Sequence, residues 1–344
     1  MSVTPTSPVE PAPPAAPAAL PAPVFMLTPG PHLHAAEHTA RIMWTVNATL
    51  APAALWGVYV FGLPALSVLA GAIMGALGAE WLAGRALGRR VSLHDGSAFC
   101  TGLLLAMTLP PAMPAWQALL GGAFAIGLGK MVFGGLGFNL FNPALLGRAF
   151  LLACFPLTMT AGWSGARDGF GAPLDAVTAA TPLALAKEHG LNAGIASLTA
   201  PGGPWQALAL GFRAGSLGEV SALLVALGAV VLVARRIISL TTPLAVFAGL
   251  ALVTLPSGAA GFHLLTGGLW IGAFYMATDY VTSPTTTRGQ LVFGFVIGAL
   301  TGVIRIWGGY PEGICYAILL ANAFVPALDS AFRRRRIPLA GTPS

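Results

Sequence analysis

A threonine directly before a proline marks the segment Asp175-Ala-Val-Thr-Ala-Ala-Thr-Pro-Leu183. Pro182 disfavours the α region for the residue before it and itself suits the first position of a helix. Thr181 is therefore predicted to cap a helix that begins LALAKEHG after the proline. A phosphate on the Thr181 hydroxyl would lie at the positive end of that helix, facing free backbone N–H groups. From the residues alone, Thr181 is either a plain helix cap or an attachment point for a phosphate group.

Three ionisable side chains lie within or at the end of apolar segments. Lys130 and Arg148 flank the break FNP at 141–143, and Asp279 precedes the break TSP at 282–284. Ionisable groups inside a membrane are costly, so they mark either a transport path or a paired structural role. We predict that these residues either form an ion pathway or make ion pairs and carbonyl caps that hold broken helices together.

Aromatic residues lie near the threonine in sequence, namely Trp163, Phe170 and Trp205. Such rings stack on flat cofactors, and tryptophan also anchors chains at the lipid interface. Both roles remain open. The three cysteines are far apart, with no CxxC pair and no Cys/His cluster, so we expect buried thiols and no metal site.

The composition is that of a membrane protein. Hydrophobic residues make up 56% and charged residues 8% of the 344 residues, and the mean hydropathy is +0.78. Soluble domains carry about 25% charged residues. Apolar windows of about 20 residues, enough to cross about 30 Å of hydrocarbon, recur along the chain. We predict an all-α integral membrane protein with about ten transmembrane helices, at 43–62, 64–84, 97–110, 115–137, 143–159, 217–235, 242–256, 262–278, 290–307 and 311–330.

The basic residues indicate orientation. With both termini in the cytoplasm, 11 of the 17 Lys and Arg fall on that side, among them Arg85, Arg89, Arg90 and the run 333–336. Because these residues lie at span ends and not along one face, the pI of about 9.7 does not indicate nucleic-acid binding. Glu80 and Asp329 are expected near the cytoplasmic ends, solvated, and Glu312 in an outer turn, either solvated or facing a neighbouring subunit.

The spans divide the chain into five predicted parts. They are a disordered Pro/Ala-rich cytoplasmic tail (1–40), a first helix bundle (41–159), an extracytoplasmic loop (160–216), a second bundle (217–330) and a basic cytoplasmic tail (331–344). Long loops in compact proteins are usually functional. The loop at 160–216 is therefore the first place to look for chemistry.

An internal echo suggests two related five-helix halves. The segment from Thr108, TLPPAMPAWQALLGGAFAIGLGKM, resembles TLPSGAAGFHLLTGGLWIGAFYM from Thr254, about 145 residues later. Halves with broken helices at matching places are typical of transporter-like folds. The two copies run in the same direction in the predicted topology, so either a segment such as 97–110 is re-entrant or the echo arose by chance. Small-xxx-small spacing at Gly71/Gly75, Gly268/Gly272 and Gly294/Gly298/Gly302 predicts close helix packing.

Several blocks together resemble the RnfD components of Rnf-type ion-translocating ferredoxin:NAD oxidoreductase complexes. They are TPGPHLHAAEHTARIMWTVNATLAP (28–52), LHDGSAFCTGLLLAMTLPP (93–111), GKMVFGGLGFNLFNPALLGRAFLL (129–152), DAVTAATPLALAKEHG (175–190), FYMATDYVTSPTTTRGQLVFG (274–294) and GGYPEGICYAILLANAFVPALD (308–329). The block at 175–190 resembles the signature Asp-x-x-Ser/Thr-Gly-Ala-Thr, in which a flavin transferase esterifies FMN through its phosphate to the last threonine. Asp175, Thr178 and Thr181 match that signature, and Ala179 stands where glycine is usual.

The resemblance implies a membrane flavoprotein in the bacterial inner membrane, with the flavin-bearing loop in the periplasm. Its FMN would be covalently bound to Thr181, with Asp175, Thr178, Pro182, Trp163 and Trp205 nearby. A second, non-covalent flavin such as riboflavin is left open. The partners implied are the other membrane, iron–sulfur and flavin subunits of the complex, the flavin transferase and the lipid bilayer. Electron flow between ferredoxin and NAD would be coupled to sodium or proton transport, with the NAD site on a partner subunit.

Two alternatives remain. The NqrB components of the sodium-translocating NADH:quinone oxidoreductases have the same span pattern and a similar flavin-threonine motif. A channel or secondary transporter without redox function would also have glycine-broken helices. Such a transporter has no need of a flavin acceptor, so bound flavin distinguishes it from the redox proteins.

Overall fold

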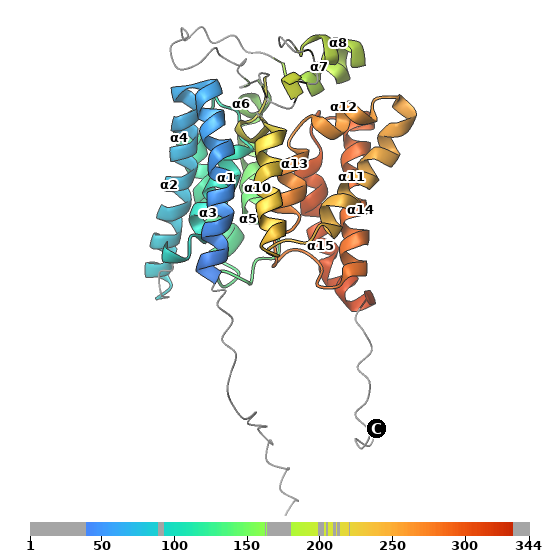
Figure 1. Cartoon of the computed structure of the whole chain (residues 1–344). Helices are drawn as coiled ribbons and strands as arrows, with labels where there is room; N and C mark the ends of the chain where they lie inside the picture. The colour runs from blue at the N-terminus through green and yellow to red at the C-terminus, as the bar shows by residue number, and fades with distance from the viewer. Residues whose placement is uncertain are drawn as a thin grey trace, which may run out of the picture. The chain divides into compact units, whose positions relative to one another are not determined.

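A computed structural model of the chain describes residues 39–88, 93–161, 163, 180–198, 203, 206–208, 211, 214–219 and 221–332. The described residues form helices and connecting segments, with no strand among them. Helix α1 (Thr39–Phe61) begins and α15 (Ile314–Phe332) ends at the same end of the bundle, which we call the terminal end. Helices α7 (Pro182–His189) and α8 (Leu191–Ala196) lie at the opposite end, the loop end (Figure 1).

The helices have the length and polarity of a membrane protein. Three of them, α2 (Leu63–Ala86), α14 (Thr287–Trp307) and α15, are long and apolar enough to cross a membrane. Shorter apolar helices include α3 (Ser97–Met107), α5 (Pro143–Cys154), α10 (Ala222–Ala234) and α11 (Thr241–Thr254). An 11-residue helix such as α3 rises only about 17 Å, so it cannot cross alone. The prediction of a helical membrane protein is confirmed, while the count of ten spans stays a prediction.

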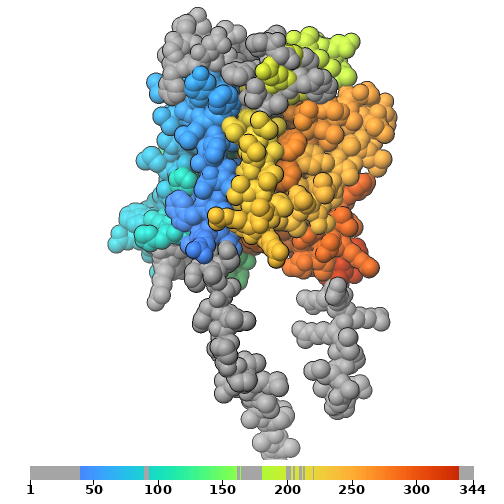
Figure 2. All heavy atoms as spheres, viewed as in Figure 1, coloured from blue at the N-terminus to red at the C-terminus, as the bar shows by residue number. Residues whose placement is uncertain are grey.

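The outer surface of the helices is apolar. Leu55, Met74 and Val230 are each more than 60% exposed, as expected for side chains that face lipid. On the face shown in Figure 2, α1 and α10 lie side by side, and a groove lined by Trp44 and Leu227 runs between them.

Two segments predicted as single helices are broken. The prediction of a continuous helix at 143–159 is wrong, because α5 ends at Cys154 and α6 (Pro156–Ala161) begins anew. Pro156 has no N–H and so cannot continue the α5 ladder.

The predicted helix at 262–278 is interrupted as well. It divides into α12 (Ala260–Leu265), α13 (Leu269–Ile271) and a π-helical turn, η5 (Gly272–Met276). Gly267 separates α12 from α13 with a φ of 71°, in the left-handed region that favours glycine.

The sequence echo corresponds to a shared local structure. Helix α4 (Ala115–Ile126) continues into a π-helical turn, η2 (Gly127–Met131), and each residue of η5 lies 145 positions after its counterpart in η2. Each turn is followed by a break and then a new helix, α5 or α14. Because π-helical turns are rare and concentrate at functional sites, their repetition marks the two breaks as places to search for a site.

A second relationship links two helix pairs of opposite direction. α2 and α4 run parallel toward the terminal end, and α11 and α14 run parallel toward the loop end (Figure 1). Each pair packs very closely: a Cβ added at Gly75 would lie 2.0 Å from the Leu119 carbonyl oxygen, and one at Gly298 would lie 2.0 Å from that of Val246. The predicted packing glycines are thus confirmed in these helices. Gly268 is an exception, since a Cβ there would meet nothing closer than 3.8 Å. The opposed pairs have the geometry expected of an inverted repeat.

Candidate functional site

Thr181 occupies the predicted helix-capping position. Its Oγ1 accepts a hydrogen bond from the Ala184 N–H at 3.2 Å, and Pro182 is the first residue of α7. Thr181 is 5% exposed. The predicted cap is therefore confirmed, and the hydroxyl lies at the N-terminal end of α7. Asp175, Thr178, Phe170 and Trp205 fall outside the described residues.

A cavity of about 280 Å³ lies beside α7, and we call it the loop-end pocket. Its wall includes Trp163, Ala184, Glu188, Tyr310, Tyr316, Arg148 and Glu312. Ala184 and Glu188 follow Thr181 at positions i+3 and i+7, so one face of α7 carries all three. Trp163 thus lies at the cavity beside α7.

Arg148 makes an ion pair at this pocket. Its Nη2 lies 2.5 Å from Glu312 Oε2, and its Nη1 donates to the Thr108 carbonyl at 2.7 Å. The other oxygen of Glu312 accepts from the Gly268 N–H at 3.1 Å. Arg148 therefore makes an ion pair and a carbonyl contact, which are the contacts expected of one of its two predicted roles. Glu312 was predicted to be solvated or to face a partner, and the missed signal was the need of an intramembrane arginine for a carboxylate.

Lys130 belongs to a second buried cluster. Its Nζ donates to Glu80 Oε1 at 2.9 Å and to Ser97 Oγ at 2.7 Å. The two charged side chains are 3% and 1% exposed. The prediction that Glu80 is solvated at a helix end is wrong, because Lys130 pairs with it inside the bundle. Asp329 is bonded too: it accepts from the N–H and the hydroxyl of Thr285.

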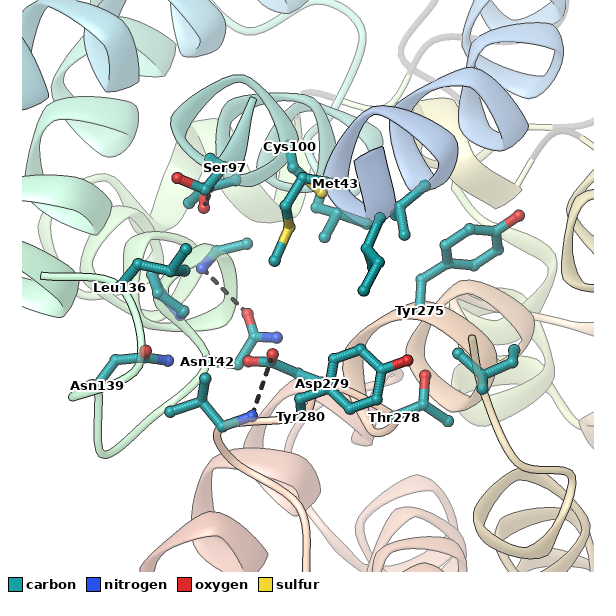
Figure 3. A pocket seen from close by; sticks show the side chains of 18 of the residues that line it. Met43, Ser97, Cys100, Leu136, Asn139, Asn142, Tyr275, Thr278, Asp279 and Tyr280 are labelled. Atoms are coloured by element: carbon teal, nitrogen blue, oxygen red, sulfur yellow. Dashed lines mark hydrogen bonds between the residues drawn. The ribbon is translucent and has the colours of Figure 1, made fainter. Parts of the chain in front are cut away.

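A second cavity, the terminal-end pocket, lies near this cluster (Figure 3). Its labelled lining residues are Met43, Ser97, Cys100, Leu136, Asn139, Asn142, Tyr275, Thr278, Asp279 and Tyr280. The side chains of Asn142 and Asp279 both point into it. Asp279 accepts hydrogen bonds from Val281 N–H at 3.5 Å and Thr282 Oγ1 at 3.2 Å. Of the three ionisable residues predicted as an ion pathway, the structure therefore brings Lys130 and Asp279 to one pocket and Arg148 to the other.

Asn142 ties the two breaks together. Its Oδ1 caps α5 by accepting from the Ala144 and Leu145 N–H groups, and its Nδ2 donates to the Met276 carbonyl at the end of η5. The side-chain amide of Asn322 is oriented so that its nitrogen faces carbonyl groups and its oxygen accepts a hydrogen bond from the Asn142 N–H at 3.0 Å. Sequence reasoning missed this residue, although an asparagine before a proline at a break is a helix-capping signal.

Helix α5 connects the two pockets. Asn142 and Pro143 line the terminal-end pocket, while Arg148 and Leu152 line the loop-end pocket. At 1.5 Å per residue, the six residues from Asn142 to Arg148 span about 9 Å. Two cavities at opposite ends of the bundle are thus separated by less than two turns of one helix.

The cysteines differ from one another. Cys100 and Cys315 are buried free thiols, as predicted, whereas the prediction for Cys154 is wrong because it is exposed. Cys315 donates from Sγ to the Leu145 carbonyl at 3.6 Å. Among the residues that the structure describes, no group of three or more His, Cys, Asp or Glu could hold a metal ion.

Comparison with known proteins gives consistent matches over most of the chain. The model of the NQR2, RnfD, RnfE family matches residues 26–338. Component D of the proton-translocating ferredoxin:NAD(+) oxidoreductase complex of Clostridium ljungdahlii is 40% identical over 314 residues, covering 89% of this chain and 94% of that protein. Component D of the Na(+)-translocating ferredoxin:NAD(+) oxidoreductase complex of Acetobacterium woodii is 39% identical over 308 residues, covering 89% and 93%.

A third relative is component D of an ion-translocating oxidoreductase complex of Stutzerimonas stutzeri. It is 42% identical over 325 residues, covering 86% of this chain and 91% of that protein. The matched region includes every described helix. The chain therefore belongs to the NQR2, RnfD, RnfE family, among the RnfD components of Rnf-type ion-translocating oxidoreductase complexes.

Proposed function

We propose that the chain is a membrane flavoprotein subunit whose FMN is esterified through its phosphate to the Thr181 hydroxyl. The observation that carries the proposal is the place of Thr181: it caps α7, and the same face of α7 forms a wall of the loop-end pocket. A phosphate there is favoured by the helix N-terminus, where the Ala184 N–H already points at Thr181 Oγ1.

The residues of the loop-end pocket fit a flavin. Its volume, about 280 Å³, is just below the range of about 300–1,000 Å³ for small-molecule sites. Trp163, Tyr310 and Tyr316 offer aromatic surfaces for a flat ring, and the Arg148–Glu312 pair offers polar groups. When bound, the flavin would supply electron transfer. The chain's own residues would hold it, orient it and limit its contact with water.

The names of the relatives support the wider role. They describe ferredoxin:NAD(+) oxidoreductase complexes, so we assign the NAD and iron–sulfur chemistry to partner subunits and the attachment of FMN to a flavin transferase. One name specifies protons and the other sodium, at 40% and 39% identity. Either ion therefore fits this chain, with Lys130, Arg148 and Asp279 as candidates for its path.

The terminal-end pocket is the place where a second, non-covalent flavin such as riboflavin would be held; its volume of about 90 Å³ is below the range of small-molecule sites, so the pocket would have to widen to admit the ring. Polar groups from Asn139, Asn142, Thr278 and Asp279 line it together with the apolar side chains of Met43 and Leu136. A few placed polar groups in a mainly apolar cavity are typical of cofactor sites.

The orientation follows from the arrangement of charges. The run of arginines at 333–336 follows α15, which ends at the terminal end. By the excess of Lys and Arg in cytoplasmic segments, we assign the terminal end and both termini to the cytoplasm and α7 to the periplasm of a bacterial inner membrane.

The attachment is tested by expressing the chain with the flavin transferase and measuring in-gel flavin fluorescence and peptide masses. Wild type is expected to carry an FMN-sized adduct on the peptide that contains Thr181, Thr181→Ala to carry none, and Thr181→Ser to keep it. Wild type without covalent flavin would overturn the proposal and favour a channel or transporter. Quinone reduction by the assembled complex would favour the NADH:quinone oxidoreductase alternative.

The second flavin is tested in the Thr181→Ala chain purified away from the other subunits, because the complex includes a further flavin subunit. Acid extraction should release a flavin in about equimolar amount, and Cys100→Phe, which fills the pocket, should remove it while Cys100→Ala keeps it. No extractable flavin in Thr181→Ala would show that the terminal-end pocket has another role.

A further inference from the structure

Helix α7 is fixed to the helix bundle at two points. Leu183 is buried in an apolar cluster that includes Phe262 of α12. One turn later, the Lys187 ammonium donates to the carbonyl of Ile304 at 3.2 Å, to that of Tyr310 at 2.9 Å and to that of Gly308. One side chain thus joins α7 to the end of α14 and to the segment that follows it.

The chemistry of this contact suits lysine. Ile304 and Gly308 lie at the C-terminal end of α14, and a cation is favoured at that negative end of the helix dipole. An ammonium has three donors, which match the three carbonyls. Desolvation by burial lowers the pKa of Lys187, whereas the carbonyl acceptors favour its charged form. The contact is therefore specific in both charge and geometry.

The contact also sets which face of α7 meets the loop-end pocket. Leu183 and Lys187 are four residues apart and lie on one face, and Ala184 and Glu188 form the neighbouring face that lines the pocket. Tyr310 contributes its carbonyl to Lys187 and also lines the same pocket. Two walls of the pocket, α7 and the segment at 309–312, are therefore held together by one ammonium group.

We propose that Lys187 is a positioning residue that docks the flavin-bearing helix and fixes its rotation, so that a group attached at Thr181 enters the loop-end pocket. This inference rests on the proposed attachment at Thr181. Lys187 does not touch the reacting ring: it acts through α7 and through the backbone of Tyr310.

The test compares three forms of the assembled complex: wild type, Lys187→Met and Lys187→Arg. Methionine keeps much of the aliphatic stem and removes the donors. Covalent FMN, measured by peptide mass, should stay at wild-type level in both variants. Quenching of flavin fluorescence by iodide should rise severalfold in Lys187→Met, and the ferredoxin:NAD rate should fall about tenfold or more, because small displacements of a bound group are costly. Lys187→Arg keeps the charge, so its iodide quenching and its electron-transfer rate should both be close to those of wild type.

Two further variants separate a positioning role from general damage. His189→Asn changes an exposed residue of the same helix and should match wild type. Gly308→Ala disturbs the acceptors, since its Cβ would lie 2.6 Å from the Ile304 carbonyl oxygen, and it should reproduce Lys187→Met.

Hydrogen exchange of the peptide spanning 183–189 reports on the docking without any flavin. Unchanged exchange in Lys187→Met would overturn the docking role, and unchanged quenching and rate at full FMN content would overturn the positioning role. Absence of covalent FMN from wild type would instead overturn the proposed function and the positioning role with it, while exchange would still report whether Lys187 docks α7.

Discussion

The two buried ion pairs differ in what surrounds them. The side chains of Lys130 and Glu80 are 3% and 1% exposed, and the hydroxyl of Ser97 completes their cluster. Those of Arg148 and Glu312 are 10% and 12% exposed and form part of the wall of the loop-end pocket. Both pairs satisfy charges inside a membrane protein. Lys130 and Ser97 reach the edge of the terminal-end pocket while Glu80 does not line it, whereas both Arg148 and Glu312 line the loop-end pocket. The greater burial of the first pair predicts a larger contribution to stability, and the place of the second pair in the wall beside α7 predicts a role at the proposed site of the covalent flavin.

The largest expected effect on stability is that of Glu80→Ala. It leaves the Lys130 ammonium buried without its carboxylate, which costs about 3–5 kcal/mol of unfolding free energy. Thermal or denaturant unfolding of the purified chain in detergent measures the loss. The double variant Glu80→Leu/Lys130→Met should recover most of it, because no charge then remains in the cluster. A double variant as unstable as Glu80→Ala would contradict this, because it would show that the loss of stability does not come from an unpaired buried charge.

Arg148→Met should lower stability less, by about 1–3 kcal/mol, because water in the adjoining cavity can solvate Glu312. Its main effect should be on function: the rate of electron transfer between ferredoxin and NAD by the complex should fall at least tenfold, while covalent FMN stays on Thr181. Unfolding, flavin content and rate, measured on one preparation, check this. A stability loss as large as that of Glu80→Ala, with an unchanged rate per folded complex, would remove the distinction between the two pairs.

The smallest effect is expected for Ser97→Ala. It removes one of the acceptors of Lys130 and should lower the unfolding free energy by about 1 kcal/mol. The rate per folded complex should stay at wild-type level, because the lost contact supports the Lys130–Glu80 pair and lies away from the loop-end pocket. A fall in rate at full stability would show that the Lys130 cluster takes part in transport.

Local signals in the sequence predicted part of this site. Pro182 was enough to predict the cap at Thr181, since it restricts the backbone of both residues. The apolar surroundings of Arg148 predicted a partner, but Glu312 lies 164 positions later, and no local rule reaches that far. Glu80 illustrates the same limit, because its burial depends on a lysine 50 positions away.

The fold shows the same division between local and long-range information. Apolar windows located the long helices, and small-residue spacing located the close packing at Gly75 and Gly298. The interruption of 262–278 was not predicted, because a continuous run of apolar residues predicts one unbroken helix. The break leaves the Met276 carbonyl, at the end of η5, available to the Asn142 side-chain amide in the other half of the chain. Such long-range contacts cannot be predicted from local sequence.

The tie at Asn142 also has a consequence for biosynthesis. Asn142 leaves the ribosome long before its partners, since Met276 follows it by 134 residues and Asn322 is in the last helix of the bundle. Until both have been inserted into the bilayer, the start of α5 has polar groups whose final partners do not yet exist, and in lipid such groups are costly. The start of α5 therefore reaches its final contacts only when the last helix has joined it, and both pockets are completed late because each has lining residues after position 270.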